Sequence, residues 1–318
     1  MHPLIVRLPN HLGDACMALP AIQCLAAAGA RITLAGRPWS AALFEAAGWP
    51  VITLPADRSA SIAVLRSAVR GQAPNVESLL LTNSFSSALE FRIAGARPSG
   101  YATDGRRLLL RTAVTVPRDW AGDMHTVAYY LYLAQAFRLA LGAAPSARRE
   151  NGVPVPLLPV SEAARARARA ALLAAGVAGA YVVLCPTARG LHRGREKCWD
   201  GFGRLAGELT ASGLTVVVCP GPGEEAAARV AVPDARLIDP LDLGGFAGLL
   251  AGSRLVVAND SGPGHLAAAV GARLVGVFGV TDPTKTRPVG PSVHIVGGMA
   301  GWPQYDQVRS QVVALLAD

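Results

Sequence analysis

The chain has 318 residues, of which 51% are apolar and 16% are charged, and its formal net charge is +8. This length suits two domains of about 150 residues each, and no stretch approaches the roughly 18 uninterrupted apolar residues of a membrane span. The positive charge indicates an anionic partner, but the absence of a dense Lys/Arg block or a basic–aromatic repeat argues against nucleic acid.

The beginning of the chain, MHPLIVRLPN, lacks the pattern of a secretory signal. The five cysteines form neither a C-x-x-C pair nor a zinc spacing with histidine. We therefore expect a cytoplasmic protein with reduced thiols.

The first half of the chain alternates short apolar runs with alanine-rich helical segments. Strands are predicted at 3–8, 31–36, 51–55 and 76–83, with helices at 14–28, 39–47, 59–70 and 85–94. This order predicts a parallel sheet covered on both faces. A longer helix is predicted at 124–141, and the following segment at 142–159, which holds four prolines, is interpreted as the interdomain linker.

The same alternation resumes after the linker. Strands are predicted at 180–186, 214–221, 236–240, 254–260 and 272–279, with helices at 161–175, 200–212, 223–231 and 243–251. An amphipathic helix at 305–318 ends the chain and could pack back on the N-terminal domain. We therefore predict an α/β protein with two doubly wound, Rossmann-like domains, 1–150 and 151–318. Their ligand sites would face each other across a cleft at the carboxyl ends of the strands.

The loop NDSGPGH, at 259–265, carries the most specific signal. A strand precedes it, SGPG is predicted as a turn, and a helix is predicted from His265. Gly262 and Gly264 would let the backbone approach a ligand, and Ser261 adds a hydroxyl donor beside the positive end of the helix dipole. This combination suits a phosphate or diphosphate. The alternative is a plain capped helix, in which His265 is a helix-end hydrogen-bonding residue.

Two more loops follow predicted strands of the second domain. CPTARGLHRGREKCW brings a hydroxyl and several cations toward the same edge, where they could bind a diphosphate or form an ordinary basic surface. These residues are Thr187, Arg189, His192, Arg193, Arg195 and Lys197. Trp199 is predicted to pack in the core. In PGPGEEAAARV, Glu224 or Glu225 could accept hydrogen bonds from ribose hydroxyls, or simply complement a helix dipole.

The first domain offers RLPNHLGDACMALPAI directly after its first strand. Gly13 permits a tight turn, and Asp14 is placed at the start of the next helix. A carboxylate there could act as a general base or could be a plain helix cap.

Four stretches together resemble the motifs of the lipopolysaccharide heptosyltransferases, glycosyltransferase family 9. They are PNHLGDACMALPAI, the Lys-x-Trp of REKCWDGF, CPGPGEE and NDSGPGHLAAAVGARLVGVFGVTDP. They follow one another in the expected order between position 9 and position 291. Three positions depart from the family pattern: Thr187 stands where Gly is usual, Ser261 where Thr is common, and His11 where an aromatic residue is frequent.

The resemblance implies a GT-B fold and an inverting glycosyltransferase that moves heptose from ADP-heptose to an inner-core sugar of lipopolysaccharide. By motif match, Asp14 is the general base and Lys197 holds the diphosphate. The match also implies donor contacts by Asp260, Ser261, Gly262, Gly264, His265 and either Glu224 or Glu225. No cofactor and no metal are expected, and the chain lacks the D-x-D pair that often holds a metal in other glycosyltransferases.

The resemblance also implies an anionic glycolipid acceptor at the cytoplasmic face of the inner membrane, where the enzyme would be peripheral. The candidate acceptor-binding residues are Asn10, His11, Arg58 and Arg106, although any single arginine could simply be solvated. Three alternatives remain open: a related glycosyltransferase with another nucleotide-sugar donor or a different acceptor, a nucleotide-sugar epimerase of similar fold, and a binding protein that has lost catalysis.

Overall fold

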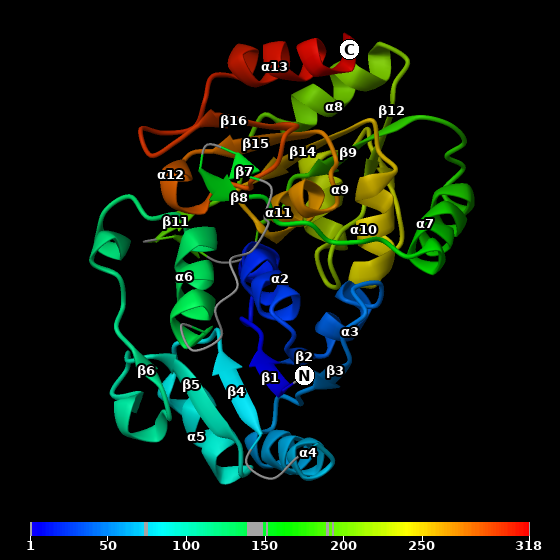
Figure 1. Ribbon diagram of the computed structural model, residues 1–318. Helices are drawn as coiled ribbons and strands as arrows, with labels where there is room; N and C mark the ends of the chain where they lie inside the picture. The colour runs from blue at the N-terminus through cyan, green and yellow to red at the C-terminus, as the bar shows by residue number, and fades with distance from the viewer. Residues whose placement is uncertain are drawn as a thin grey trace. The chain divides into compact units, whose positions relative to one another are not determined.

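Figure 1 shows the computed structural model, which describes residues 2–72, 76–138, 149–150, 152–188, 191–192 and 194–317. The chain forms two compact units, Met1–Pro156 and Leu157–Asp318. The division falls inside the segment predicted as the linker, of which residues 142–148 and 151 lie outside the described residues. Part of that segment pairs as two short antiparallel strands, β7 (Arg149–Glu150) and β8 (Val153–Pro154).

A six-stranded sheet in the order β3-β2-β1-β4-β5-β6 forms the centre of the first unit, and all its strand pairs are parallel. The strands are β1 (Pro3–Arg7), β2 (Arg31–Gly36), β3 (Val51–Thr53), β4 (Glu77–Leu80), β5 (Arg97–Tyr101) and β6 (Ala113–Val114). The first four confirm the predicted strands. The sequence did not predict β5 and β6, because RPSGY has no apolar run and a two-residue strand gives no periodic pattern.

Helices cover both faces of this sheet. They are α1 (Leu12–Met17), α2 (Leu19–Ala27), α3 (Trp39–Leu43), α4 (Arg58–Arg70), α5 (Phe85–Ile93) and α6 (Thr126–Arg138), with 3₁₀ turns η1 (Arg106–Leu109) and η2 (Arg118–Ala121). Side chains of α4 and α5, among them Leu65 and Phe91, pack on Ile5 and Leu80 in one core cluster. The single helix predicted at 14–28 is two helices joined at Ala18, because Pro20 stands in the first turn of α2 and has no N–H to continue α1.

The second unit repeats the same strand order. Its six-stranded sheet runs β13-β12-β9-β14-β15-β16, again with every pair parallel. The strands are β9 (Tyr181–Cys185), β12 (Thr215–Val218), β13 (Arg236–Leu237), β14 (Leu255–Asn259), β15 (Leu274–Phe278) and β16 (Val293–Gly297). The sequence did not predict β16, because this edge strand is only partly buried and its apolar run is short. A small hairpin of β10 (Leu191–His192) and β11 (Arg195–Glu196) follows β9.

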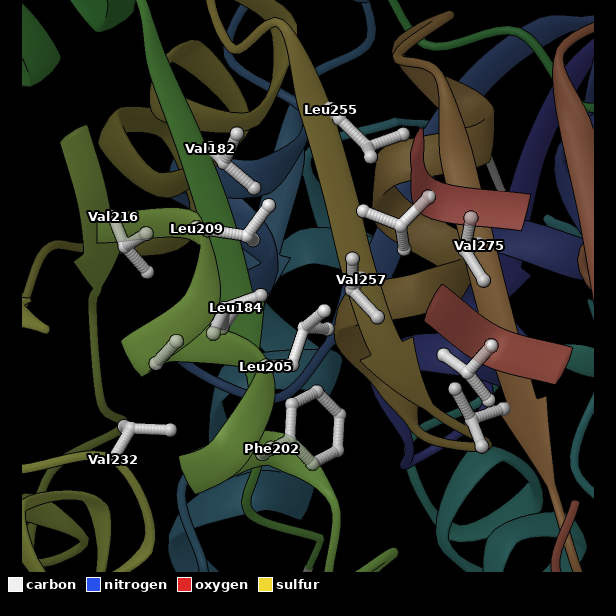
Figure 2. Close-up of a cluster of buried hydrophobic side chains, with 14 of the residues drawn as sticks. Val182, Leu184, Phe202, Leu205, Leu209, Val216, Val232, Leu255, Val257 and Val275 are labelled. Carbon is white, nitrogen blue, oxygen red and sulfur yellow. The ribbon is translucent and has the colours of Figure 1, made fainter. Parts of the chain in front are cut away.

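The helices of the second unit are α7 (Glu162–Ala174), α8 (Phe202–Ala211), α9 (Glu225–Ala231), α10 (Leu243–Ala251), α11 (Gly262–Ala269), α12 (Pro283–Thr286) and α13 (Tyr305–Ala317). Figure 2 shows Phe202 and Leu205 of α8 packed on Val182, Leu184 and neighbouring strand residues. Full burial of each such side chain contributes about 2 kcal/mol.

The final helix belongs to the same core. Val308, Val312, Leu315 and Leu316 of α13 join the cluster that covers β14 and β15. The apolar residues of this helix therefore pack within their own unit. No helix in the described part of the chain combines the length and apolarity that crossing a membrane would require.

Candidate functional site

The strand order of each sheet identifies where a ligand would bind. In both sheets the chain order reverses between two central strands, β1 and β4 in the first unit and β9 and β14 in the second. Sheets of this type bind ligands beyond the carboxyl ends of their strands at this switch point. We call the side of each sheet formed by these strand ends its carboxyl edge. The two carboxyl edges are described separately.

Lys197 and Asp260 form an ion pair at the carboxyl edge of the second sheet. The Lys197 Nζ lies 3.1 Å from Oδ2 of Asp260, which directly follows β14. The hydroxyl of Thr281 donates to the same oxygen at 2.6 Å. Asp260 is buried, whereas the Lys197 side chain remains 22% exposed. Since an ammonium has three N–H donors, Lys197 retains donors for a further anion while Asp260 holds it in place.

Asn259, the last residue of β14, joins this edge to the basic loop that follows β9. Its side chain is 1% exposed, and its Oδ1 accepts a hydrogen bond from the backbone N–H of Trp199 at 2.9 Å. Its Nδ2 donates to the carbonyl of Pro186 at 2.7 Å. The amide thus fixes both ends of the loop that carries Lys197. Sequence reasoning missed this role, although a polar residue directly after the buried run VVA was a visible signal.

The ring of Trp199 strengthens the same anchor. It is 4% exposed, as the sequence predicted, and stacks on Tyr305 of α13 with 6.0 Å between ring centroids. A Cβ at Gly201 would lie 2.1 Å from this ring, so only glycine fits there. Lys197 is therefore two residues from a side chain that is locked in the core.

The glycine-rich loop has a different local structure from the predicted one. The helix α11 begins at Gly262 rather than at His265, so SGPG is not a free turn. Pro263 explains the earlier start, because its fixed φ favours the first helical turn. Ser261 is the N-cap residue, makes no side-chain cap, and its hydroxyl donates to the carbonyl of Asn259 at 3.2 Å. The positive end of the helix dipole consequently lies beside Ser261 and Gly262.

Gly264 and His265 both lie in the buried part of α11. A Cβ at Gly264 would make ordinary contacts with Ala258, the carbonyl of Asn259 and Pro288, each at 3.6 Å. The role of its backbone in approaching a ligand stays a prediction. His265 is also buried, at 7% exposure, consistent with the alternative of a helix-end residue that makes hydrogen bonds.

Glu224 and Thr187 connect two further strand ends. The Thr187 hydroxyl donates to Oε2 of Glu224 at 2.8 Å, and the Gly221 N–H donates to the same oxygen at 3.4 Å. Thr187 follows β9 and Glu224 follows β12, so both lie at the carboxyl edge. This contact favours Glu224 over Glu225, the first residue of α9, as the acid that faces a ligand.

Arg195 is the other cation of the basic loop that the structure describes in full. Arg189 and Arg193 lie outside the described residues, as does the side chain of His192. Arg195 donates to the carbonyl of Gly279 at 3.4 Å. Among the residues that the structure describes, no three His, Cys, Asp or Glu side chains gather as a metal site would require.

In the first unit, Asp14 is held by a buried tyrosine. The hydroxyl of Tyr130 on α6 donates to Oδ1 of Asp14 at 3.1 Å. Burial, with the nearby Asp14 carboxylate as the next cause, raises the pKa of Tyr130 well above its ordinary value, so the phenol stays protonated. The N-cap of α1 is His11 and Asp14 is the third helical residue, so Asp14 is not a plain cap. It is a half-exposed carboxylate with a fixed donor.

The aromatic residues around α6 keep Tyr130 in position. The Tyr101 hydroxyl donates to the carbonyl of Tyr129 at 2.7 Å, and the two rings stack with centroids 4.3 Å apart. Asn83, which follows β4, donates to the Tyr129 hydroxyl at 3.0 Å. The helix that presents Tyr130 is thus tied to the ends of β4 and β5.

The prediction that Arg106 binds an acceptor is wrong. Its side chain is fully buried, and its guanidinium donates to the carbonyls of Tyr101, Thr82 and Ser84 at 2.9, 2.6 and 3.3 Å. Burial lowers the pKa of Arg106 to about 10. This arginine therefore holds the loop after β5 against the loop after β4. The other acceptor candidates are accessible: Asn10 and His11 are exposed, and Arg58 pairs with Glu90 at 3.4 Å.

Similarity to known proteins agrees with this geometry. Residues 62–315 match the family described as glycosyltransferase family 9 (heptosyltransferase). The chain belongs to this family. The match spans most of both units and confirms the resemblance seen in the sequence motifs.

Individual members of this family match the chain only over part of its length or at low sequence identity. A lipopolysaccharide heptosyltransferase 3 from Escherichia coli is 35% identical over 132 residues, which covers 38% of this chain and 38% of that protein. The structure of E. coli ADP-heptose LPS heptosyltransferase II superposes with a TM-score of 0.78 at 21% identity, covering 100% of this chain and 99% of that one. E. coli heptosyltransferase WaaC with ADP gives 0.73 at 21% identity, covering 99% and 100%. These structures confirm the GT-B fold of the family.

Replacement of Arg106 tests its structural role. Arg106→Met leaves buried carbonyls without donors, so we expect a loss of about 3 kcal/mol in the free energy of unfolding, measured by urea denaturation. The matched control is the exposed neighbour change Arg107→Met, for which we expect less than about 0.5 kcal/mol. Equal stability of the two variants would contradict the assignment.

The Asn259 anchor is tested in the same way. Asn259→Ala leaves the Trp199 N–H and the Pro186 carbonyl unpaired, so we expect a loss of about 3 kcal/mol in urea denaturation followed by circular dichroism. Ser261→Ala removes one partly exposed hydroxyl from the adjacent position and should cost no more than about 0.5 kcal/mol. If the loss in the free energy of unfolding were as small for Asn259→Ala as for Ser261→Ala, Asn259 would not anchor the loop.

Proposed function

We propose that this chain is an inverting glycosyltransferase that moves heptose from ADP-heptose to an inner-core sugar of lipopolysaccharide. Membership of the heptosyltransferase family supports the reaction class. The partly matching lipopolysaccharide heptosyltransferase 3 supports the acceptor, and the similarity to WaaC, whose solved structure holds ADP, supports the donor nucleotide. The Lys197–Asp260 pair at the start of α11 is the observation in this chain that carries the proposal.

The donor diphosphate would bind at the carboxyl edge of the second sheet. Lys197 would donate to phosphate oxygens and stabilise the negative charge that develops on ADP as it leaves. The dipole of α11 and the hydroxyl of Ser261 would act on the same group. Glu224, oriented by Thr187, would accept hydrogen bonds from ribose. These groups supply the positive charge themselves, so we propose a reaction that needs neither metal nor cofactor.

The acceptor reaction would take place at Asp14. The carboxylate would take the proton of an acceptor hydroxyl while that oxygen bonds to the anomeric carbon of heptose. The bond from this carbon to the diphosphate oxygen breaks on the opposite face, ADP leaves, and the configuration inverts. Tyr130 would hold one carboxylate oxygen so that the other faces the acceptor.

The acceptor is proposed to be an anionic glycolipid. Its lipid would keep it in the bilayer, so the enzyme would work in the cytoplasm as a peripheral protein at the inner membrane. Two other activities are compatible with the same fold: a family 9 transferase with a different sugar donor or acceptor, and an epimerase that acts on the nucleotide sugar alone. A transfer assay separates them.

The first test is mass spectrometry of heptose-free and mono-heptosylated inner-core lipid A after incubation with ADP-heptose. Wild type should add one heptose to one of these acceptors. Asp14→Asn should lower the rate by about 10³-fold, since general-base catalysis is worth about 10²–10⁴. Asp57→Asn, at the exposed N-cap of α4, is the matched control and should react as wild type does.

The outcomes discriminate among the alternatives. Equal rates for wild type and Asp14→Asn would show that Asp14 is not the general base. No heptose transfer by a protein that still binds ADP would reject the proposed donor–acceptor pair. Conversion of the nucleotide sugar without any acceptor would instead indicate an epimerase.

A separate prediction concerns Tyr130. Tyr130→Phe removes the hydrogen bond to Asp14, so we expect kcat to fall about tenfold with little change in KM for ADP-heptose, because a bond to a charged group contributes about 1.5–3 kcal/mol. Tyr132→Phe on the same helix is the control, since Tyr132 is 41% exposed. Indistinguishable kcat values for the two variants would show that Tyr130 does not position the base.

A further inference from the structure

Three arginines stand at the carboxyl edge of the first sheet, one beyond each of three neighbouring strands. Arg7 ends β1, Arg37 directly follows β2, and Arg58 begins α4 after β3. These strands are neighbours in the order β3-β2-β1. Since all three are parallel, the arginines lie in sequence along one edge. The connection that follows Arg7 leads into α1, the helix that carries Asp14.

Arg7 is the most constrained of the three. Its side chain is buried, at 6% exposure, and its guanidinium donates to the carbonyl of Leu8 and to Oδ1 of Asn10, the latter at 2.8 Å. Its Nε has no hydrogen-bond partner within the described part of the chain. Burial lowers the pKa of Arg7 to about 10, with Arg37 contributing in the same direction and Glu90 opposing it. A buried cation therefore lies within electrostatic range of a second cation.

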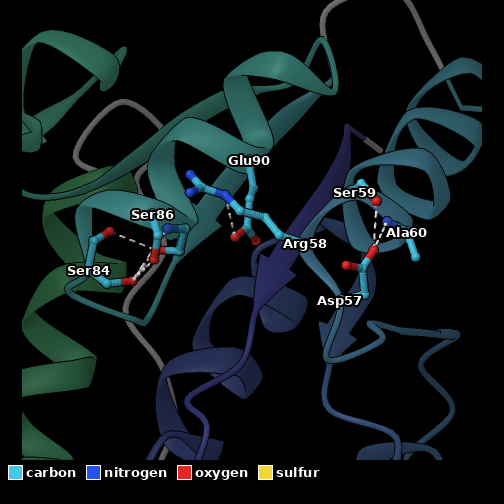
Figure 3. Close-up of polar contacts among 8 residues, drawn as sticks. Asp57, Arg58, Ser59, Ala60, Ser84, Ser86 and Glu90 are labelled. Carbon is cyan, nitrogen blue, oxygen red and sulfur yellow. Dashed lines mark hydrogen bonds and ion pairs between the residues drawn. The ribbon is translucent and has the colours of Figure 1, made fainter.

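The carboxylates at this edge are already engaged by other groups. Figure 3 shows Glu90 of α5 paired with Arg58, with 3.4 Å between Oε1 and Nε. Asp57 caps α4 instead, accepting from the Ala60 N–H at 2.8 Å and the Ser59 hydroxyl at 2.7 Å. Among the described residues, no hydrogen bond or ion pair engages the half-buried Arg37 guanidinium. Asp14, the third carboxylate at this edge, accepts from the Tyr130 hydroxyl. Within the described residues, the ion pairs at this edge therefore leave Arg7 and Arg37 without a carboxylate partner.

A buried arginine beside a second arginine is costly unless an anion joins them. We propose that Arg7 and Arg37 form an anion subsite that binds a carboxylate or phosphate group of the acceptor. Guanidinium groups suit both anions because their N–H donors match two oxygens at once. Asn10 orients Arg7, and Arg58 marks the outer margin of the subsite.

This subsite rests on the proposed function and deepens it, because it places the charged group of the acceptor on the same edge as Asp14. The diphosphate of the donor has its own cation, Lys197, in the second unit. Arg106, which the sequence also suggested for acceptor binding, is fully buried, and its Nε and Nη1 donate to carbonyls. The specificity of the enzyme for an acidic acceptor would therefore depend on Arg7 and Arg37.

The test uses small probes that carry one anionic group on a sugar. Glucuronate supplies a carboxylate, glucose 6-phosphate supplies a phosphate, and glucose is the neutral control. Binding to the full chain is measured by ligand-observed NMR at low ionic strength. Wild type should bind at least one anionic probe and not glucose, and Arg37→Gln should weaken that binding about tenfold, as expected for loss of a charge-assisted contact.

The matched control is Arg31→Gln. Arg31 is exposed and begins the same strand, β2, so the variant removes the same charge from the opposite edge of the sheet. It should bind the probes as wild type does, and both variants should bind ADP with unchanged affinity. In the transfer assay, Arg37→Gln should raise the KM for the acceptor without changing the KM for ADP-heptose.

Either of two results would overturn the subsite. In the first, glucuronate and glucose 6-phosphate bind no more tightly than glucose. In the second, Arg31→Gln weakens the binding of these probes as much as Arg37→Gln does. The probe that binds more tightly identifies the acceptor anion as carboxylate or phosphate. If heptose transfer fails while probe binding still depends on Arg37, the transferase function is wrong and the anion subsite stands.

Discussion

The buried amide of Asn259 is the interaction on which the carboxyl edge of the second sheet depends. Its two hydrogen bonds join the end of β14 to both ends of the loop after β9, across the point where strand order reverses. Asp260, the next residue, then meets Lys197 at 3.1 Å. In a parallel sheet the carboxyl ends of the strands lie at one edge, but this arrangement does not fix the loops that follow them. Here one side chain fixes the loop, and the position of Lys197 follows.

Two buried arginines of the first unit, Arg106 and Arg7, differ in what surrounds them. Arg106 gives its donors to three carbonyls and holds two loops together. Arg7 is almost as deeply buried, and within the described part of the chain each of the two guanidinium groups has one nitrogen without a partner, Nε of Arg7 and Nη2 of Arg106. What distinguishes Arg7 is its neighbour, which is a second cation, Arg37. Both look alike in the sequence, where each is an arginine close to the end of a strand.

Strong hydrophobic patterns made most of the fold predictable. The Val/Ile/Leu runs of β1, β9, β14 and β15 could be identified directly, and their alternation with helices fixed the class. Strand β5, with the sequence RPSGY, could not be identified, because its conformation comes from pairing with β4 rather than from its own residues. Asp14 and Lys197 could be chosen from their motifs. Asn259 and Tyr130 could not, because their importance lies in contacts between residues distant in the sequence.

The raised pKa of Tyr130 has a consequence for recovery of the enzyme between turnovers. Because the phenol stays protonated, Tyr130 would not be the final acceptor of the proton that Asp14 takes from the acceptor hydroxyl. In the proposed reaction this proton would pass to water. Asp14 is half-exposed, which provides that route once the product has left. Product departure and regeneration of the base would then be one event, and a product that lingers would also delay deprotonation.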